Sequence, residues 1–237
     1  MTEVARGSDP PYPPMSAQGG PDRKGRDRIR SAQGGPESAG GTTKPARPVG
    51  PLAGPDGRLR CPWGLSAPDY VAYHDAEWGR PVHGDQAIFE RLCLEAFQSG
   101  LSWLTILRKR ENFRKAFAGF DIPVVAAFTD ADVARLLADA GIVRNRAKIN
   151  AAITNARAAA GLTQGLSDLV WGYASAGPRP APRTLADLPA QTPESKALAK
   201  ELRDRGFVFT GPVTVYAAMQ ACGLVNDHLE ACFARAG

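Results

Sequence analysis

The 237-residue sequence predicts an all-α fold, and three observations lead to that prediction. Apolar residues recur at helical spacing through most of the chain after about residue 60. Helix start and stop signals, such as Thr192–Pro193 before one segment and Gly206 after it, divide this part into short pieces. Only the stretch 207–209 has the composition of an extended strand, so no sheet is expected.

The beginning of the chain differs in composition from the rest. Residues 1–58 are rich in Gly, Pro, Ser and Arg and nearly lack large apolar side chains. Such a segment cannot bury enough apolar surface to offset the entropy lost on ordering, so it is expected to be a disordered tail. Residues 59–237 are then expected to form one α-helical domain, which is long enough for a single hydrophobic core.

Each expected helix follows from its own pattern of apolar residues and its own end signals. Thr129 and Asp132 have the spacing of a capping box, and Gly141 is the expected stop of the helix that they begin. Two further helical pieces are expected on either side of Gly223 near the end of the chain. The other helices are expected within residues 84–98, 101–120, 131–140, 144–160, 166–174 and 193–205.

Composition excludes several classes of protein. No apolar run reaches the roughly 18–20 residues of a membrane span, and the N-terminus lacks the pattern of a secretory signal. Four cysteines in a chain of this length do not make a disulfide framework, which fits a reducing cytoplasm. The net charge of +5 is mild, and part of it lies in the basic stretch 22–30, which favours solubility or non-specific contact with a polyanion.

The segment 61–79 is unusually dense in aromatic residues. It holds Trp63, Tyr70, Tyr73 and Trp78 within a stretch interrupted by Pro and Gly. Aromatics so arranged could form the walls of a pocket for a flat ligand, or a packed cap over the core. Composition alone leaves both interpretations open.

Glu95 interrupts an otherwise apolar helix face just before Gly100 and Trp103. A carboxylate among apolar residues costs free energy unless it is paired or functional. It could accept hydrogen bonds from an amino group of a ligand, or lie at the edge of the face beside an arginine. The sequence does not choose between these.

Residues 136–149 have the pattern of a helix-hairpin-helix, in which a short turn at Gly141 leads into a helix that opens with Arg144, Arg146 and Lys148. The amides of such a turn and the positive end of the second helix can bind a DNA phosphate without reading sequence. No Asp or Glu occurs from Ala140 to Ser167, so the positive charge is not cancelled locally. Any basic helical hairpin shares this pattern.

Two Cys–His pairs are candidate metal ligands: Cys61 with His74, and His228 with Cys232. On a helix, residues four apart lie on one face, which suits two ligands of one ion and equally suits two core residues. The spacing is not that of a standard zinc finger. Two Cys and two His would make a closed tetrahedral set, which is typical of structural rather than catalytic zinc.

Six segments together resemble the constitutive bacterial DNA-3-methyladenine glycosylase family (glycosylase I). The likeness runs from about residue 60 to 233. The segments are YHDAEWG (73–79), LEAFQSGLSW (94–103), ILRKRENFRKAFAGFD (106–121), AGIVRNRAKI (140–149), NARA (155–158) and YAAMQACGLVNDH (216–228).

The resemblance implies an all-α helix-hairpin-helix glycosylase fold with one structural Zn²⁺ that joins the two ends of the domain. It implies catalytic roles for Glu95 and Tyr73 and contacts to the excised base for Trp103, Trp63 and Trp78. The zinc ligands so implied are Cys61, His74, His228 and Cys232, and the DNA-backbone contacts so implied are Gly141, Arg144, Arg146 and Lys148. Departures are modest: Ala96 stands where the family usually has Gly, and Pro62 follows the first Cys.

The activity that the resemblance implies is hydrolysis of the N-glycosidic bond of 3-methyladenine in alkylated double-stranded DNA, with the base flipped out of the helix. The enzyme is expected to be a monofunctional, cytoplasmic and nucleoid-associated monomer. Three other classes of function remain to be separated from it: a non-catalytic DNA-binding module, a catalytic zinc hydrolase with an open coordination position, and a globular scaffold.

Overall fold

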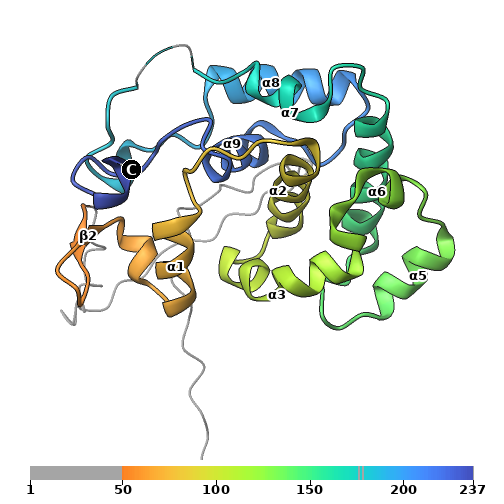
Figure 1. Cartoon of the computed structure of the whole chain (residues 1–237), viewed down its shortest axis with the longest axis horizontal. Coiled ribbons are helices and arrows are strands. Elements are labelled where there is room, and N and C mark those ends of the chain that lie inside the picture. Colours follow the sequence, from red (N-terminus) through yellow and green to blue (C-terminus); the bar gives the residue numbers. More distant parts are fainter. Residues whose placement is uncertain (1–49, 176, 178, 237) are drawn as a thin grey trace, which may run out of the picture.

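The structure is a computed structural model that describes residues 50–175, 177 and 179–236. Within these residues nearly all regular structure is helical, which confirms the all-α fold class (Figure 1). The α-helices are α1 (Pro68–Ala76), α2 (Asp85–Gln98), α3 (Trp103–Ala116), α4 (Ile122–Ala126), α5 (Asp130–Ala138), α6 (Arg146–Ala160), α7 (Leu166–Trp171), α8 (Pro193–Asp204) and α9 (Pro212–Ala221). Short 3₁₀ helices span Pro62–Leu65, Ala118–Phe120, Leu185–Asp187 and Phe233–Ala236.

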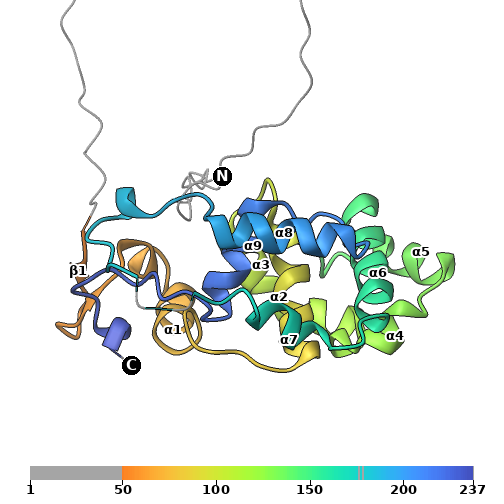
Figure 2. The same cartoon turned by 90° about the horizontal axis from the view of Figure 1, so that it is seen from above.

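Helices α2 and α9 pack together in the middle of the domain, with α7 and α8 along one side (Figure 1). Helices α4, α5 and α6 form one end, while α1, the strands and the C-terminal segment form the other (Figures 1 and 2). The core runs through both halves, and its central helix α2 contributes Ile88, Phe89 and Leu94, which are fully buried. No helix in the described residues is long and apolar enough to cross a membrane.

The start of the folded part differs from the expectation. Two short strands, β1 (Leu52–Ala53) and β2 (Leu59–Arg60), pair antiparallel around a turn in which Gly57 has a φ of 77°. No strand was expected here, because strands of two residues are too short to show an alternation of apolar and polar residues. Residues 50–58 therefore belong to the folded part, which corrects the boundary at residue 58. Of the tail predicted for residues 1–58, residues 1–49 lie outside the described residues.

Helix α1 was not expected from the aromatic segment. Pro68 occupies its first turn, where the missing N–H is no loss. The helix buries Tyr70, Tyr73 and His74 on one side, since these positions are three and four residues apart. Helix α1 therefore directs these side chains of the aromatic-rich segment into the interior of the domain.

The residues after Gly223 were expected to be helical, and that expectation is wrong. Gly223 ends α9 with a φ of 74°, and the chain from 224 to 232 is irregular. The buried Asp227 carboxylate accepts hydrogen bonds from Tyr216 and Gln220. The Arg235 guanidinium donates to the carbonyl of His228 at 2.6 Å. Specific side-chain bonds, not helix geometry, set the shape of this segment.

Candidate active site and metal-binding cluster

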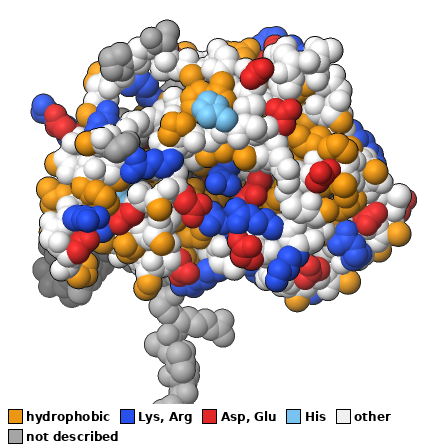
Figure 3. Space-filling model, viewed as in Figure 1, with side chains coloured by type: hydrophobic (Ala, Val, Ile, Leu, Met, Phe, Trp, Pro, Cys, Tyr) orange, Lys and Arg blue, Asp and Glu red, His pale blue; other side chains and the backbone are white. Residues whose placement is uncertain are grey.

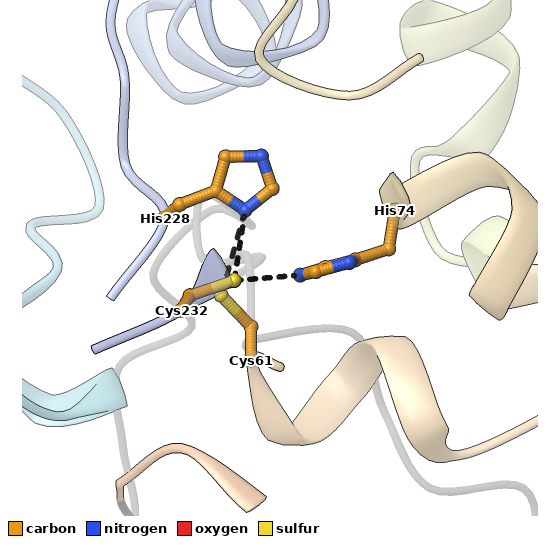
Figure 4. A group of neighbouring side chains, drawn as sticks. All are labelled: Cys61, His74, His228 and Cys232. Carbon is orange, nitrogen blue, oxygen red and sulfur yellow. Dashed lines mark hydrogen bonds between the residues drawn. The ribbon is translucent and has the colours of Figure 1, made fainter. Parts of the chain in front are cut away.

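Four donor atoms from opposite ends of the folded chain meet in the interior. Cys61 Sγ, His74 Nε2, His228 Nδ1 and Cys232 Sγ lie within 4.8 Å of one another, and all four residues are buried (Figure 4). Cys61 precedes the first 3₁₀ helix and His74 is on α1, whereas the other two lie in the irregular segment after α9. The structure thus brings together the two pairs that the sequence analysis proposed as ligands.

The distances within this Cys/His cluster fit tetrahedral coordination. Cys232 Sγ is 3.4 Å from His74 Nε2 and 3.6 Å from His228 Nδ1. Cys61 Sγ is 3.7 Å from His228 Nδ1. Zinc bonds of about 2.3 Å to sulfur and about 2.0–2.1 Å to nitrogen would place S and N donors about 3.6 Å apart at tetrahedral angles. A single zinc-sized ion would therefore fit between the donors.

Each histidine uses its other ring nitrogen to hold its orientation. His74 Nδ1 lies 2.8 Å from Asp75 Oδ1, and His228 Nε2 lies 3.0 Å from the carbonyl oxygen of Trp78. Arg60 in turn holds Asp75 through bonds of 2.9 and 2.8 Å. Acceptors on the outer nitrogens keep the protons there, so the inner nitrogens present lone pairs to the cluster, as metal-binding histidines do.

Two glycines make room for the imidazole rings. A Cβ at Gly64 would lie 2.7 Å from a ring carbon of His74, which no real side chain could occupy without displacement. A Cβ at Gly79 would lie 3.1 Å from the His228 ring, and its φ of 78° already favours glycine. The backbone on both sides of α1 is therefore shaped around the cluster.

The aromatic residues predicted to bind a base form a connected group that reaches the cluster. The Trp63 ring lies 5.0 Å from Trp78, 6.3 Å from Tyr73 and 5.1 Å from His74. Tyr73 lies 5.5 Å from Trp103, the first residue of α3. The Trp63–Trp78 and Trp63–His74 pairs are edge-to-face, an arrangement that stabilises ring positions beyond simple burial. The Cys/His cluster thus supports the rings from behind.

Glu95 is buried inside the domain, with 1% of its surface exposed. Among the described residues neither of its carboxylate oxygens has a hydrogen-bond partner. Burial raises the pKa of Glu95 to about 8, and the nearby Arg91 charge offsets this only in part. The alternative of a surface glutamate paired with an arginine is therefore wrong, because Arg91 bonds Glu90 instead.

Other buried polar atoms, on α2 and on two of the tryptophans, also lack hydrogen-bond partners among the described residues. They are Gln98 Oε1 and the indole nitrogens of Trp78 and Trp103. Buried polar atoms in folded proteins are nearly always hydrogen-bonded, so this group favours a site for a polar, flat ligand. The sequence analysis missed Gln98. The available signal was its position three residues after Glu95, on the same helix face.

The hairpin between α5 and α6 differs from the prediction at two residues. Arg144 and Arg146 are exposed, as a phosphate contact requires. The Gly141 amide, however, already donates to Asp139 Oδ1 at 2.7 Å, so it is not free for a phosphate. Lys148 is buried and donates to the carbonyls of Phe97 and Ser99 at 2.8 and 2.5 Å. Its predicted contact with the DNA backbone is corrected to a bond that fastens the end of α2 to α6.

Many other arginines are neutralised within the protein. Basic and acidic side chains alternate across the face shown in Figure 3. Arg110 pairs with Glu77 at 2.6 Å and Arg114 pairs with Glu90 at 2.7 Å, which ties α3 to the preceding helices. These cations are engaged in internal ion pairs and are therefore poor candidates for DNA contacts.

Comparison with known proteins shows which family this chain belongs to. Residues 63–235 match the family model described as methyladenine glycosylase. The chain belongs to this family. It is 48% identical over 177 residues to DNA-3-methyladenine glycosylase 1 of Escherichia coli (strain K12), which covers 73% of this chain and 95% of that protein.

Solved structures of family members are also similar. A crystal structure of 3-methyladenine DNA glycosylase I superposes with a TM-score of 0.71 at 48% identity and covers 73% of this chain and 98% of that one. A structure on 3-methyladenine recognition by the Staphylococcus aureus enzyme gives a TM-score of 0.70 at 35% identity, over 74% of this chain and 96% of that one. The fold and the family therefore agree.

The raised pKa of Glu95 predicts a pH-dependent effect on stability. Below about pH 4 the carboxyl is protonated in both the folded and unfolded states. Between there and the folded pKa of about 8, only the unfolded state loses the proton, so the wild type loses stability as pH rises. Glu95→Gln should remove this loss. The variant's advantage in free energy of unfolding should be near zero at pH 4 and grow to about 3–5 kcal/mol by pH 9.

Urea unfolding of both proteins at several pH values measures this difference. An advantage that is independent of pH, or that shrinks as pH rises, would contradict the assignment of Glu95 as a buried, unpaired carboxyl.

Proposed function

We propose that the protein is a base-excision-repair DNA glycosylase that hydrolyses the N-glycosidic bond of 3-methyladenine in alkylated DNA. Family membership and the names of its relatives support this activity. The observation in this chain that carries the proposal is the buried Glu95 carboxyl, which lacks a partner among the described residues, near the end of the helix that precedes Trp103. A scaffold or a simple DNA-binding module has no need of such a group.

The proposed discrimination between 3-methyladenine and normal adenine follows from the charge of the base. Adenine methylated at N3 is cationic while it is attached to the sugar, whereas normal adenine is neutral. Electron-rich indole faces attract a cationic ring more than a neutral one. A cationic base near Glu95 would also supply the positive charge that the surroundings of the carboxyl lack. It would lower the pKa of Glu95 below 8 and so favour the ionised carboxylate. The carboxylate would then accept hydrogen bonds from the amino group of the base.

The chemical step needs little acid catalysis. The bond between the sugar C1′ and N9 of the base breaks, and its electron pair neutralises the charge of the departing ring. Water adds hydroxide to C1′ and releases a proton to solvent. Because no Asp or Glu occurs from Ala140 to Ser167, the second hairpin helix supplies no carboxylate for this step. No lysine Schiff base is involved, so the DNA strand is not cut.

The residues divide into three roles. Glu95 and Tyr73 act on the reacting base, with the Tyr73 ring beside Trp103. Trp103, Trp63 and Trp78 hold and enclose the flat ring. Arg144 and Arg146 contact the phosphates of double-stranded DNA, because they are exposed in a stretch without acidic residues. We propose that the protein acts as a monomer, in the cytoplasm on the nucleoid.

We also propose that the Cys/His cluster binds one structural Zn²⁺. The fit rests on the donor spacing and on the partners of the two outer ring nitrogens. Four protein donors fill a tetrahedral shell, which favours a structural ion over a catalytic one with an open position. Through Cys61, His74, His228 and Cys232 the ion would join the two ends of the domain behind the aromatic group. This geometry argues against the alternative of a zinc hydrolase.

The activity is tested by incubating the protein with methylated duplex DNA and identifying the released base by chromatography. We expect 3-methyladenine as the main product. Release mainly of 7-methylguanine would contradict the proposed specificity.

Glu95→Gln is expected to lower the excision rate about 100-fold, because it removes a charge that stabilises the cationic base in the transition state. The change keeps the size of the side chain, so the fold should persist, as thermal unfolding would show. Single-turnover kinetics on alkylated duplex DNA give the rate. Excision at the wild-type rate would remove Glu95 from the mechanism.

Cys232→Ser is expected to lose bound zinc and stability first, and activity only as a consequence. Metal analysis by mass spectrometry should give about one zinc per wild-type chain and much less in the variant. Cys93→Ser is the matched control, because Cys93 is also buried but lies on α2 outside the cluster. Equal zinc content in the two variants would refute the site.

Arg144→Ala and Lys148→Met should affect different properties: the first should change DNA binding and the second should change stability. Removing Arg144 should weaken DNA binding and reduce the slope of log K against log salt by about 0.9, with little change in stability. Removing the Lys148 ammonium leaves the buried carbonyl of Phe97 and the carbonyl of Ser99 without their donor, and should cost about 1–3 kcal/mol of stability with an unchanged salt slope. Anisotropy titrations at several salt concentrations and urea unfolding measure both. A reduced salt slope in Lys148→Met would restore Lys148 as a phosphate contact.

A further inference from the structure

The loop between α8 and α9 ends in an exposed apolar pair. Val208 is 41% exposed and Phe209 is 44% exposed. Phe209 also has a φ of 57°, in the left-handed region that bulky residues avoid. Phe120 shares a positive φ but is fully buried, so packing compensates for its backbone. Phe209 lacks that compensation, and such an outlier points to a role outside the folded core.

This tip, Val208–Phe209, is held in place by hydrogen bonds to α6. The Asn155 side chain on α6 donates from Nδ2 to the Val208 carbonyl at 3.0 Å and accepts from the Val208 amide at 2.8 Å. Asn155 itself is 2% exposed. The buried side-chain amide of Asn155 thus bonds both the N–H and the carbonyl of Val208. These bonds fix the backbone just before Phe209 and hold Phe209 in its exposed position.

The same face of α6 holds a second loop. Lys148 lies seven residues before Asn155, two helical turns away on the same face. It binds the carbonyls of Phe97 and Ser99, and the chain then passes Gly100 to the exposed Leu101. Two loops that present apolar side chains are thus fastened to one helix.

The chemistry around these loops fits duplex DNA. Helix α6 begins beside the exposed Arg144 and Arg146, and no acidic residue occurs from Ala140 to Ser167. Glu95 and Gln98, with buried oxygens that lack a partner among the described residues, lie on α2 just before the loop that Lys148 holds. Extruding a base toward these groups leaves the neighbouring base pair with an uncovered apolar face, which an aromatic ring can cover.

We propose that the Val208–Phe209 tip contacts the DNA duplex beside the extruded nucleotide, with the Phe209 ring packed against the bases that extrusion uncovers. This inference rests on the proposed glycosylase function, because it assigns a DNA-contacting residue to the same site. Phe209 is then separate from the residues proposed to bind the base, so binding of the free base does not involve Phe209.

Phe209→Gly tests the proposal, because glycine removes the ring and also relieves the backbone strain. The variant should unfold at the same temperature as the wild type or higher. It should bind free 3-methyladenine equally well, measured by tryptophan fluorescence. Excision from alkylated duplex DNA and affinity for a duplex with an abasic site should both fall about tenfold, within the range for loss of one aromatic–base stack.

Val124→Ala is the matched control, since Val124 is 46% exposed on α4 and should leave all three measurements unchanged. Wild-type duplex affinity and excision in Phe209→Gly would overturn the proposal. So would a fall in excision that is accompanied by an equal loss of stability. If the wild type releases no 3-methyladenine, the glycosylase function fails, and the duplex affinities of the two proteins still decide the role of Phe209.

Discussion

The convergence of two thiols and two imidazoles from opposite ends of the folded chain is the interaction on which the rest of the site depends. Cys61 and His74 arrive with the segment that carries Trp63, Tyr73 and Trp78, while His228 and Cys232 follow α9. The rings of Trp63 and Trp78 pack directly against the two imidazoles. A change in the cluster would therefore be transmitted to the aromatic group through these edge contacts.

The same region contains a buried carboxyl without an ion-pair partner in the described part of the chain, which would favour binding of a cationic ligand. Glu95 is enclosed with no hydrogen-bond partner among the described residues, and burial raises its pKa while the Arg91 charge opposes that shift only in part. Such a group lowers stability when it ionises, so its presence favours a function that requires it. Arginines on α3 are paired with Glu77 and Glu90, which leaves Glu95 without a compensating ion pair.

Helix α6 links the parts of the molecule that we propose to contact DNA. Its start lies at the basic hairpin, Lys148 fastens the end of α2, and Asn155 fastens the tip at Val208–Phe209. One helix thus fixes the relative positions of the proposed phosphate contacts, the loop beside the proposed base-binding groups and the exposed aromatic ring. The precision of a base-flipping site benefits from such a shared support.

The residue pattern by itself predicted the all-α class and most helix boundaries, and it named the four cluster residues as candidate metal ligands. Periodicity and capping act over a few residues, so they can be read locally, as at Thr129 and Thr192. The tertiary structure alone decided that Lys148 points inward, that Gly141 has no free amide, and that Gln98 joins Glu95. It also showed that the chain after Gly223 is irregular, because hydrogen bonds of Asp227 and Arg235 with residues seven or more positions away outweigh local helix propensity. Side-chain direction and long-range hydrogen bonding depend on which elements pack together, and no local pattern encodes that.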